Sequence, residues 1–519
     1  MMDLEFPPMN YAALAPILIL FGASLLGVLV EAFVPRARRH LVQLILGLLA
    51  VVAALVMVVL NANDRLVTAS TAVAVDGPAL FLQGAILVLA GMALLLIGER
   101  TVQRGGAFVA HAAVTVGSAE DQRQATDTDG ATEVYPLTMF AISGMLLFVA
   151  ANDLLTMFIA LEAFSLPLYL LCALARRRRL LSQEAALKYF LLGSYASAFF
   201  LFGMALVYGF TVGAGGSGTG GGVDFGTIRT AVSDSSASPV LLFAGLALLS
   251  IGLLFKIAAA PFHVWTPDVY QGAPTPITGF MAACTKVAAF GGLLRVLHVA
   301  FSGASWNFVP VLGTVAVLTM LVGSILAVTQ TDIKRLLAYS SVANAGYLLV
   351  GALALSRDGL SSTMFYLVAY GFTVLAAFGV VTLVRDADGE ATHLSRWAGL
   401  GRRSPLYAGL FTFLLLAFAG IPLTSGFTSK FAVFGAALDA GQTWLVVAGV
   451  LTSMILAFPY LRVVVMMWLS EPGESTPTVS LPGGLTATAL AIGVLATLVL
   501  GVAPAPLLDL ANGAAEFVR

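Results

Sequence analysis

Charged residues are scarce in this sequence: aspartate, glutamate, lysine and arginine make up 10% of its 519 residues, whereas 59% are hydrophobic. A soluble domain carries about 25% charged residues, so a soluble globular protein is excluded. The net charge of -1 provides no basic surface for nucleic acid. We therefore expect an integral membrane protein that does not bind nucleic acid.

Cysteine is rarer still, since Cys172 and Cys284 are the only two. Both lie in apolar runs without CxxC spacing, which indicates small buried side chains and argues against disulfide, zinc or iron–sulfur ligation. The sequence also lacks a Walker A motif and a metal-ligating cluster. We therefore expect no metal and no cofactor in this chain, so a gradient or a partner must supply the energy for whatever work it does.

Two polar stretches carry weaker signals. Gly213-x-Gly215-x-x-Gly218 has the form of a dinucleotide fingerprint, but it follows an apolar helix and opens no βαβ unit, so a flexible linker is the better interpretation. Residues 99–134 are polar with charges of both signs and predict a cytoplasmic loop. The segment before Tyr11 is acidic and lacks the positive region of a signal peptide, so we expect it to be retained.

Long apolar runs dominate what is present. Many reach roughly 20 residues, the length of a membrane-spanning helix, and none shows the alternating pattern of barrel strands. The predicted fold class is an all-α integral membrane protein. We expect about fourteen transmembrane helices, at 11–34, 41–60, 78–98, 135–151, 153–174, 184–211, 239–271, 275–299, 308–329, 335–355, 362–384, 405–438, 443–468 and 483–510.

The distribution of lysine and arginine supports this number of spans. If the N-terminus lies outside, sixteen basic residues fall in inner loops, four in outer segments and six within spans. Because inner loops are enriched in basic residues, we expect both termini on the outer, periplasmic side of a bacterial plasma membrane. The inner set includes Arg176 to Arg179, which we interpret as a topology anchor, with anionic lipid binding as the alternative.

The chain is organised around residues 241–295. Here an apolar run carries Lys256, breaks at Pro261 and His263, and is followed by a second run with Lys286 near its middle. Proline interrupts a helix, and a charge at the bilayer centre costs roughly 2.5–3.5 kcal/mol on insertion scales, so it normally marks a protein-lined ion or proton path. An interrupted span beside buried lysines is typical of a transporter site.

A second interrupted span carries Pro422, Gly426 and Lys430. The two broken spans are the seventh and the twelfth, so they run in opposite directions, as an inverted-topology repeat produces. The predicted organisation is a three-helix N-terminal segment with a cytoplasmic loop at 1–134, a first repeat of five helices at 135–299, a second at 300–470, and a C-terminal helix at 471–519.

Glu162 lies about nine residues into its span, roughly 14 Å deep. A carboxylate at that depth is either neutral or held ionised by a cation, and we expect Lys256 to contact it. A purely structural ion pair is the alternative, but desolvation makes such pairs weak stabilisers. Burial disfavours the charged form and an opposite charge favours it, so movement of Glu162 relative to Lys256 would switch proton affinity.

Four further groups are candidates for the same path. Lys286 and Lys430 lie too deep to reach the interface, whereas Lys188 is about one turn into its span and has a stem long enough to do so. His263 lies at the break and suits a proton relay, with capping of freed carbonyls as the alternative.

Three charges near predicted helix ends have simpler interpretations. Arg295 and Arg462 are expected to be interfacial anchors, and Asp332 is expected to cap the following helix, with Thr331 as the competing cap.

These residues resemble a known family. The segment KIAAAPFHVWTPDVYQGAPTPITGFMAACTKVAAF, from Lys256 to Phe290, is similar to the antiporter-like membrane subunits of respiratory complex I, the proton-pumping NADH:quinone oxidoreductase. The segments TQTDIKRLLAYSSVANAGYLL and GIPLTSGFTSKF also match. Subunits L and M and related cation/proton antiporter subunits usually have PDAH after the tryptophan, whereas PDVYQGAP is similar to the N-type branch. In one departure, Ser429 stands where the family often has glycine before the lysine.

The resemblance implies proton transfer through a central axis. It assigns Glu162 and Lys256 as a modulating pair, Lys188, His263 and Lys286 to the axis, and Lys430 to the outer exit. It also implies NADH, FMN, iron–sulfur clusters and quinone in partner subunits, with other membrane-arm subunits and membrane lipids around this chain. The alternatives are a subunit of a multi-subunit cation/proton antiporter and a structural membrane scaffold that moves no protons.

Overall fold

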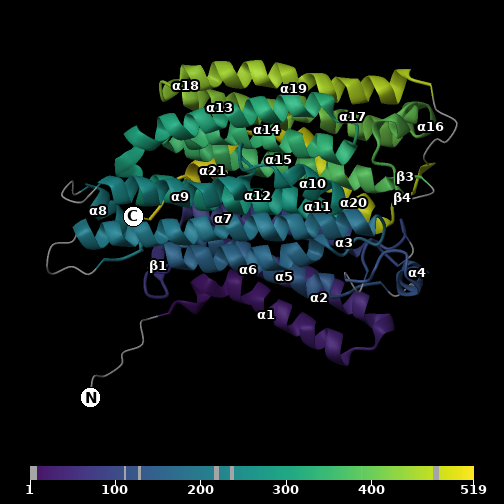
Figure 1. The fold of residues 1–519 in the computed structure, drawn as a ribbon, viewed down its shortest axis with the longest axis horizontal. Helices are drawn as coiled ribbons and strands as arrows, with labels where there is room; N and C mark the ends of the chain where they lie inside the picture. The colour runs from purple at the N-terminus through teal and green to yellow at the C-terminus, as the bar shows by residue number, and fades with distance from the viewer. Residues whose placement is uncertain are drawn as a thin grey trace.

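Long helices lie side by side in this chain, and the segments that join them gather at two opposite ends of the bundle (Figure 1). The computed structural model describes residues 9–103, 105–109, 113–126, 130–214, 221–233, 239–386, 389–471 and 478–518. Within these residues, eleven helices are long and apolar enough to cross a membrane, and two shorter apolar helices accompany them. The predicted all-α membrane fold is confirmed.

The elements of the first half are α1 (Tyr11–Phe33), α2 (Arg36–Leu60), β1 (Leu66–Thr68), β2 (Val73–Val75), α3 (Gly77–Gly98), α4 (Ala119–Thr126), α5 (Val134–Ala150), α6 (Leu154–Cys172), α7 (Arg179–Ala214), α8 (Phe225–Ser233), α9 (Pro239–Ile257), α10 (Trp265–Gly272), α11 (Thr275–Phe280), η1 (Met281–Thr285), α12 (Lys286–Arg295) and η2 (Val296–Ala300).

The elements of the second half are η3 (Ser302–Ala304), α13 (Ser305–Thr329), α14 (Ile333–Ala352), α15 (Arg357–Leu383), β3 (Val384–Asp386), β4 (Gly389–Glu390), η4 (Leu394–Trp397), α16 (Leu400–Arg403), α17 (Pro405–Ala419), α18 (Ser425–Asp439), α19 (Thr443–Leu469), β5 (Thr478–Val479), α20 (Gly484–Val502) and α21 (Ala505–Ala514).

Both predicted interruptions are present. The seventh span ends as α9 at Ile257 and resumes as α10 at Trp265, after a turn in which Ala258 has a φ of 64°. The twelfth ends as α17, and Gly420, with a φ of 85°, leads into the turn before α18. These left-handed backbone positions stop each helix. Gly420 adopts this conformation at little cost, whereas Ala258 is a non-glycine residue there.

One predicted span is wrong as a single helix. The segment 483–510 divides into α20, which ends at Val502, and the separate α21, which begins at Ala505. Pro504 and Pro506 lack the backbone donors that a continuing helix needs, so α20 cannot run on. Asp332, in contrast, caps α14 as predicted, with its carboxylate accepting from the backbone N–H groups of Lys334 and Arg335.

The centre of the bundle consists of helices that are buried on every side. The apolar stretch within Thr275–Ala300 is fully buried, and so is 94% of the stretch within Arg357–Leu383. The first of these spans is not a uniform α-helix, because the π-helical turns η1 and η2 lie on either side of α12. π-Helical turns occur often at functional sites.

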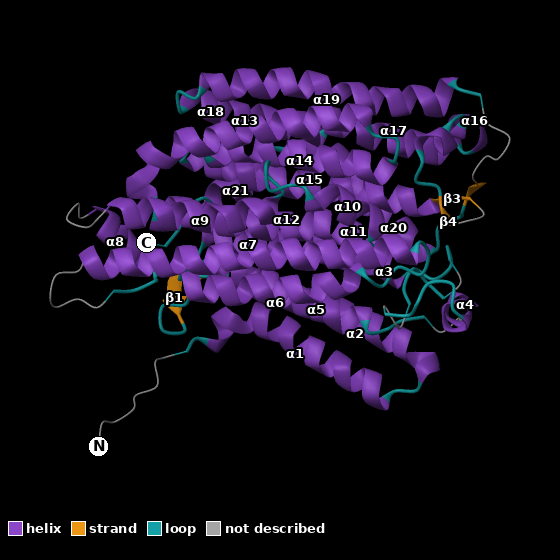
Figure 2. Cartoon of the chain, in the orientation of Figure 1, coloured by secondary structure: helices purple, strands orange, loops and turns teal. Residues whose placement is uncertain are grey.

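Short strands lie only at the ends of the bundle in the described parts of the chain (Figure 2). β1 and β2 form an antiparallel hairpin, and β4, β3 and β5 form a small sheet beyond the opposite ends of the helices. The backbone N–H of Asn10 donates to Thr68 on β1, and that of Val518 donates to Asp76, just after β2. The first and last described segments therefore meet at the hairpin end.

The arginine cluster at the start of α7 fastens loops to the bundle. Arg176 donates to the backbone carbonyls of Phe108 and Gly105, and Arg178 donates to the carbonyl of Glu390. These bonds hold two loops against the start of α7, while Arg177 and Arg178 are exposed. The topology anchor and the lipid-binding alternative both stay predictions. The glycine pattern assigned to a linker cannot be followed, because residues 215–220 lie outside the described residues.

Candidate functional site

The first buried lysine, Lys256, occupies the last turn of α9, just before the break. It is 6% exposed, and its ammonium donates a hydrogen bond of 2.7 Å to the hydroxyl of Ser165 on α6. The ammonium also lies 5.5 Å from the ring centres of Phe164, Tyr169 and Tyr189. Aromatic faces attract a cation without supplying an opposite charge, so this setting holds the ammonium in place without an ion pair.

The predicted contact between Glu162 and Lys256 is wrong. Glu162 is half-buried and accepts a hydrogen bond from Ser197 of α7, and among the described residues no ion pair joins it to Lys256. Ser165 follows Glu162 by three residues and lies on the same face of α6, where it takes the ammonium in place of the carboxylate. The charge of Glu162 still acts on Lys256 across this short gap.

Lys286 begins α12, directly after the π-helical turn η1. It is 4% exposed, and its ammonium donates to the Ser341 hydroxyl at 2.6 Å and to the Ser341 carbonyl at 2.5 Å, both on α14. The ring centre of Tyr370 on α15 lies 5.0 Å from the same ammonium. The second lysine therefore repeats the surroundings of the first: a serine hydroxyl and an aromatic face.

Lys430 lies in the second turn of α18, after the second break. Its ammonium donates to the carbonyls of Phe418 and Ala419 at 3.1 and 3.3 Å and to the Ser453 hydroxyl at 2.8 Å. The two carbonyls end α17, where the helix dipole carries partial negative charge. Ser429, the departure from the family pattern, donates to the Ser425 carbonyl at 2.6 Å within the same helix, so α18 remains regular beneath the lysine.

His263 lies in the turn between α9 and α10 and is 9% exposed. Its Nδ1 has no hydrogen-bond partner among the described residues, and the ring of Tyr339 lies 6.3 Å away, centre to centre. The carbonyl of Phe255, freed by the break, is instead occupied by the indole N–H of Trp265 at 3.0 Å. The imidazole of His263 has the backbone of Pro261, in the same turn, as a hydrogen-bond partner. Relay and capping therefore both stay predictions.

Lys188 stands apart from the buried lysines. Its side chain is 42% exposed and pairs with Glu184 at 2.6 Å and with Asp268 at 2.7 Å. Asp268 also pairs with Arg335 at 2.6 Å. Sequence reasoning missed Asp268, although an acidic residue three positions after the tryptophan of the broken span was a visible signal.

The family resemblance implies NADH-driven proton uptake, and Lys188→Ala is expected to lower that uptake by no more than about fivefold, because a half-exposed ion pair contributes about 0.2–1 kcal/mol. Asp268→Asn, which weakens two pairs at once, should have the larger effect of the two. Uptake by inverted vesicles, normalised to the amount of assembled complex, measures both. A fall to background in Lys188→Ala would instead make Lys188 an obligatory step.

Arg295, predicted to be an interfacial anchor, is fully buried. Its guanidinium pairs with Asp76 at 2.6 Å, both side chains are 0% exposed, and Phe517 lies over it at 4.9 Å. Arg462, the second predicted anchor, donates to the Val328 carbonyl at 2.8 Å at the C-terminal end of α13. Each arginine has a partner on a segment that is distant in the sequence. The residues around each arginine in the sequence do not indicate that partner.

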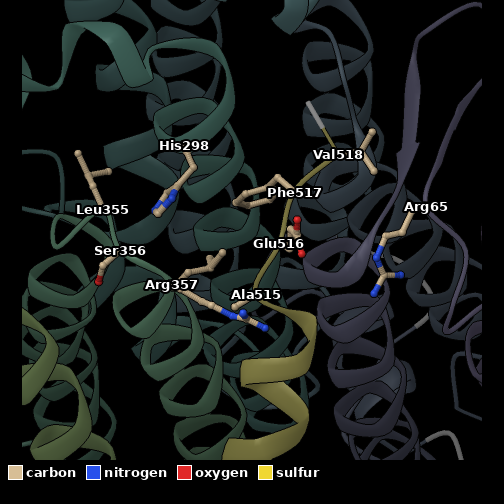
Figure 3. Close-up of a pocket in the computed structure, with 10 residues that line it drawn as sticks. Arg65, His298, Leu355, Ser356, Arg357, Ala515, Glu516, Phe517 and Val518 are labelled. Atoms are coloured by element: carbon tan, nitrogen blue, oxygen red, sulfur yellow. The ribbon is translucent and has the colours of Figure 1, made fainter.

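A cavity of about 660 Å³ opens beside Phe517, at the hairpin end of the bundle (Figure 3). Arg65, His298 and Arg357 line it together with the C-terminal residues 515–518. It is lined from the ends of elements and from the C-terminal tail, and Lys256, Lys286 and Lys430 do not line it.

Polar side chains on α14 complete the site, and sequence reasoning overlooked them. Ser340, Ser341, Asn344 and Tyr347 lie on successive turns and are 0–1% exposed. Ser341 meets Lys286, and the ring of Tyr347 lies 4.8 Å from the ammonium of Lys430. Their spacing of three and four residues within an otherwise apolar span was the available signal.

Metal and thiol chemistry have little support in the described part of the chain. No group of three or more His, Cys, Asp or Glu residues there could hold a metal ion. Cys172 and Cys284 are buried free thiols, as predicted.

Comparisons with known proteins give one family. The family model for "NADH:quinone oxidoreductase/Mrp antiporter, TM" matches residues 151–456. NADH-quinone oxidoreductase subunit N of Salinispora arenicola is 79% identical over 519 residues, covering 100% of both chains. A chain in the structure of respiratory complex I from Thermus thermophilus with bound aureothin is 33% identical, with a TM-score of 0.75, over 96% of this chain and 99% of that one.

A chain of the Mrp complex from Dietzia sp. DQ12-45-1b has a TM-score of 0.79 at 22% identity, over 98% of this chain and 97% of that one. At that identity the likeness shows a shared fold only. The N-type resemblance seen in PDVYQGAP is confirmed by the full-length matches. The chain belongs to the NADH-quinone oxidoreductase subunit N family, the antiporter-like membrane subunits of complex I.

Proposed function

We propose that this chain translocates protons as a non-redox subunit of an NADH:quinone oxidoreductase. One observation carries the proposal: Lys256, Lys286 and Lys430 are 4–6% exposed, and each donates to a serine hydroxyl. A carboxylate in contact would hold a lysine permanently charged, whereas a neutral hydroxyl binds the ammonium and the free amine alike. Each lysine can therefore gain and lose a proton.

The other candidates act around these three. Glu162 modulates Lys256 through space, His263 relays protons at the first break, and Lys188 exchanges them with water near the arginine-rich ends of the helices. Lys430, beside the second break, releases protons on the opposite side. In this sequence of proton transfers, both helix interruptions are part of the path. The first places Lys256 at the end of α9, and the second places Lys430 beside the end of α17.

The remaining parts of the reaction belong to partners. We propose that NADH oxidation through FMN and iron–sulfur clusters, and the reduction of quinone, take place in other subunits of the complex. Membrane-arm subunits and lipids surround this chain in the bacterial plasma membrane, with both termini on the periplasmic side. Within it, residues 135–299 and 300–470 form the two inverted repeats, between the segments 1–134 and 471–519.

The test is complementation of cells that lack this subunit. The native chain should restore NADH-driven, uncoupler-sensitive proton uptake in inverted vesicles, and a Lys286→Ala, Lys430→Ala double variant should restore it at least about tenfold less well. An affinity tag on the native chain should bring down flavin and iron–sulfur subunits.

Two results would contradict the proposal. Full uptake by the double variant, in complexes of normal amount, would support a membrane scaffold. A tag that brings down only antiporter-type subunits would support the cation/proton antiporter, whose family shares the fold.

A further inference from the structure

An apolar groove lies between the N-terminal and the C-terminal helices of the bundle. Its volume is about 800 Å³, and α2, α3, α15, α20 and α21 supply its walls. Val59 and Leu510 on these walls are exposed, so the groove opens at the surface of the chain. Among the described residues of its lining, Arg65 carries the one positive charge and Asp509 the one negative charge.

The groove is about as deep as one leaflet of a bilayer. Along α3 its lining begins at Gly77, the first residue of the helix, and ends at Val88. At 1.5 Å per residue this stretch is roughly 16 Å long, whereas half of the hydrocarbon core measures about 15 Å. A membrane-spanning helix of a partner would need a groove along the whole core. The length of this groove therefore fits the acyl chains of a lipid.

Small residues leave room in the groove. Gly84 lies within this stretch of α3, and a Cβ atom added there would meet only Val58 and Leu55, at 3.7 and 4.0 Å, which are ordinary contact distances. Gly513 on α21 also lines the groove, and a Cβ atom there would meet nothing within 4 Å. The described residues therefore leave a space that a chain from outside can fill.

A polar cavity adjoins the groove at the hairpin end. It is the cavity of about 660 Å³ beside Phe517, and Arg65 lines both spaces. Arg65 is exposed, and its Nη1 donates to the carbonyls of Ala62 and Asp64 in its own loop. A guanidinium has five N–H groups, so further donors are left for a ligand.

A carboxylate accompanies the arginines in this polar cavity. Glu516 is exposed and lies between Arg65 and Arg357 in the close-up view (Figure 3). Charges of both signs are therefore present where the groove ends. A molecule with a long apolar part and a headgroup that carries both charges matches this arrangement.

We propose that one aminophospholipid from the leaflet on the hairpin side occupies this site. Its acyl chains fill the groove, and its phosphate binds the guanidinium of Arg65, where the groove meets the polar cavity. Its ammonium lies in that cavity beside the carboxylate of Glu516, because opposite charges select the headgroup. The lipid joins α2 and α3 to α20 and α21. This site does not involve the buried lysines, so it does not depend on the proposed function.

Photocrosslinking tests this assignment. The purified complex is reconstituted in phosphatidylcholine with a small fraction of phosphatidylethanolamine or phosphatidylglycerol that carries a diazirine in one acyl chain. Labelling of the groove peptides of α3 and α20 is divided by labelling of α19 around Leu451 and Met454, which are exposed to any surrounding lipid. This ratio should be roughly twofold to fivefold higher for phosphatidylethanolamine, as one exposed ion pair provides.

Three variants change separate parts of the site. Arg65→Ala should lower the ratio by about fivefold for both lipids, because both have a phosphate. Glu516→Gln should remove the preference for phosphatidylethanolamine and leave labelling by phosphatidylglycerol at its native level. Gly84→Leu should fill the groove and lower the ratio for both lipids. Arg229→Ala is the matched control, since Arg229 lies on α8 at the same end of the bundle but lines neither space, and its ratio should stay native.

Two results would overturn the proposal. An equal ratio for the two lipids in the native chain, or a higher one for phosphatidylglycerol, would show that the site does not select an amine headgroup. Groove peptides without labelling, beside a labelled α19, would show that a partner subunit closes the groove. The labelling is measured without NADH, so neither result affects the proposal of proton translocation.

A second measurement does not depend on the folding of any variant. An experimental density map of the native complex should contain lipid tails along α3 between Gly77 and Val88, with headgroup density against Arg65. An empty groove, in a map that shows other lipids around the complex, would contradict the assignment.

Discussion

Lys256→Ala is expected to reduce NADH-driven proton uptake to background. The amine sits among four aromatic rings and one serine hydroxyl, so a water molecule that entered the space left by alanine would meet mostly apolar walls and would be held poorly. In the part of the chain that the structure describes, no other amine contacts the Lys256 ammonium and could take over its proton transfer. The uptake of inverted vesicles, with an uncoupler as the zero, measures the loss.

Lys256→Arg separates charge from proton transfer. Arginine keeps the positive charge and the attraction to the rings, but it cannot release its proton in the working pH range. Uptake should therefore fall as far as in Lys256→Ala. Native uptake by the arginine variant would show that a fixed charge is enough, which is incompatible with a proton carrier at this position.

Lys334→Ala is the control that shows whether the loss of a buried lysine in itself lowers proton uptake. Lys334 is 2% exposed and donates to the Ala273 carbonyl at 2.8 Å, outside the set of three proton-carrying lysines. We expect it to retain most of the uptake per assembled complex. Electrophoresis of intact complexes gives the amount of assembly for all three variants.

Arg295→Ala is expected to destabilise the folded chain by about 3–5 kcal/mol, the usual result of leaving one member of a buried ion pair alone. Asp76 is 0% exposed, and it also caps α3 by accepting from the N–H of Ala79 and holds the N–H of Val518. Without the arginine, its charge stays in an apolar region. Thermal denaturation of the detergent-solubilised protein, or its yield in membranes, should show the loss.

The double variant Asp76→Asn, Arg295→Met should recover most of that stability. It removes both charges, keeps an oxygen for the helix cap, and fills the space of the arginine stem. Arg357→Ala, whose partner is the Asn512 carbonyl at the exposed rim, should change stability by no more than about 0.5 kcal/mol. A double variant as unstable as Arg295→Ala would contradict this explanation.

Local features of the sequence predicted the fold well. Apolar length located the spans, and Pro261 and Pro422 marked the two interruptions, because each proline lies in a turn between two helices and proline disfavours a continuing helix. The failure at 483–510 has the same origin: Pro504 and Pro506 act locally, but the segment was counted by apolar length alone.

The site was only partly predictable. Depth along a span identified Lys256, Lys286 and Lys430 as buried, since depth follows from residue number and helical rise. Partners on other helices do not follow from residue number. Ser165 therefore replaced Glu162 as the contact of Lys256, and Asp76, more than two hundred residues earlier, turned a supposed anchor at Arg295 into a buried pair.

The two π-helical turns around α12 affect how related chains should be aligned. Each such turn holds one residue more than the α-helix would use for the same path, so side chains beyond it are rotated by about 100° about the axis. A helical wheel drawn continuously from Thr275 to Ala300 therefore gives Lys286 and Arg295 the wrong facing directions. A relative with one residue deleted from 281–285 would present its lysine toward α14 only if compensating turns restored that angle.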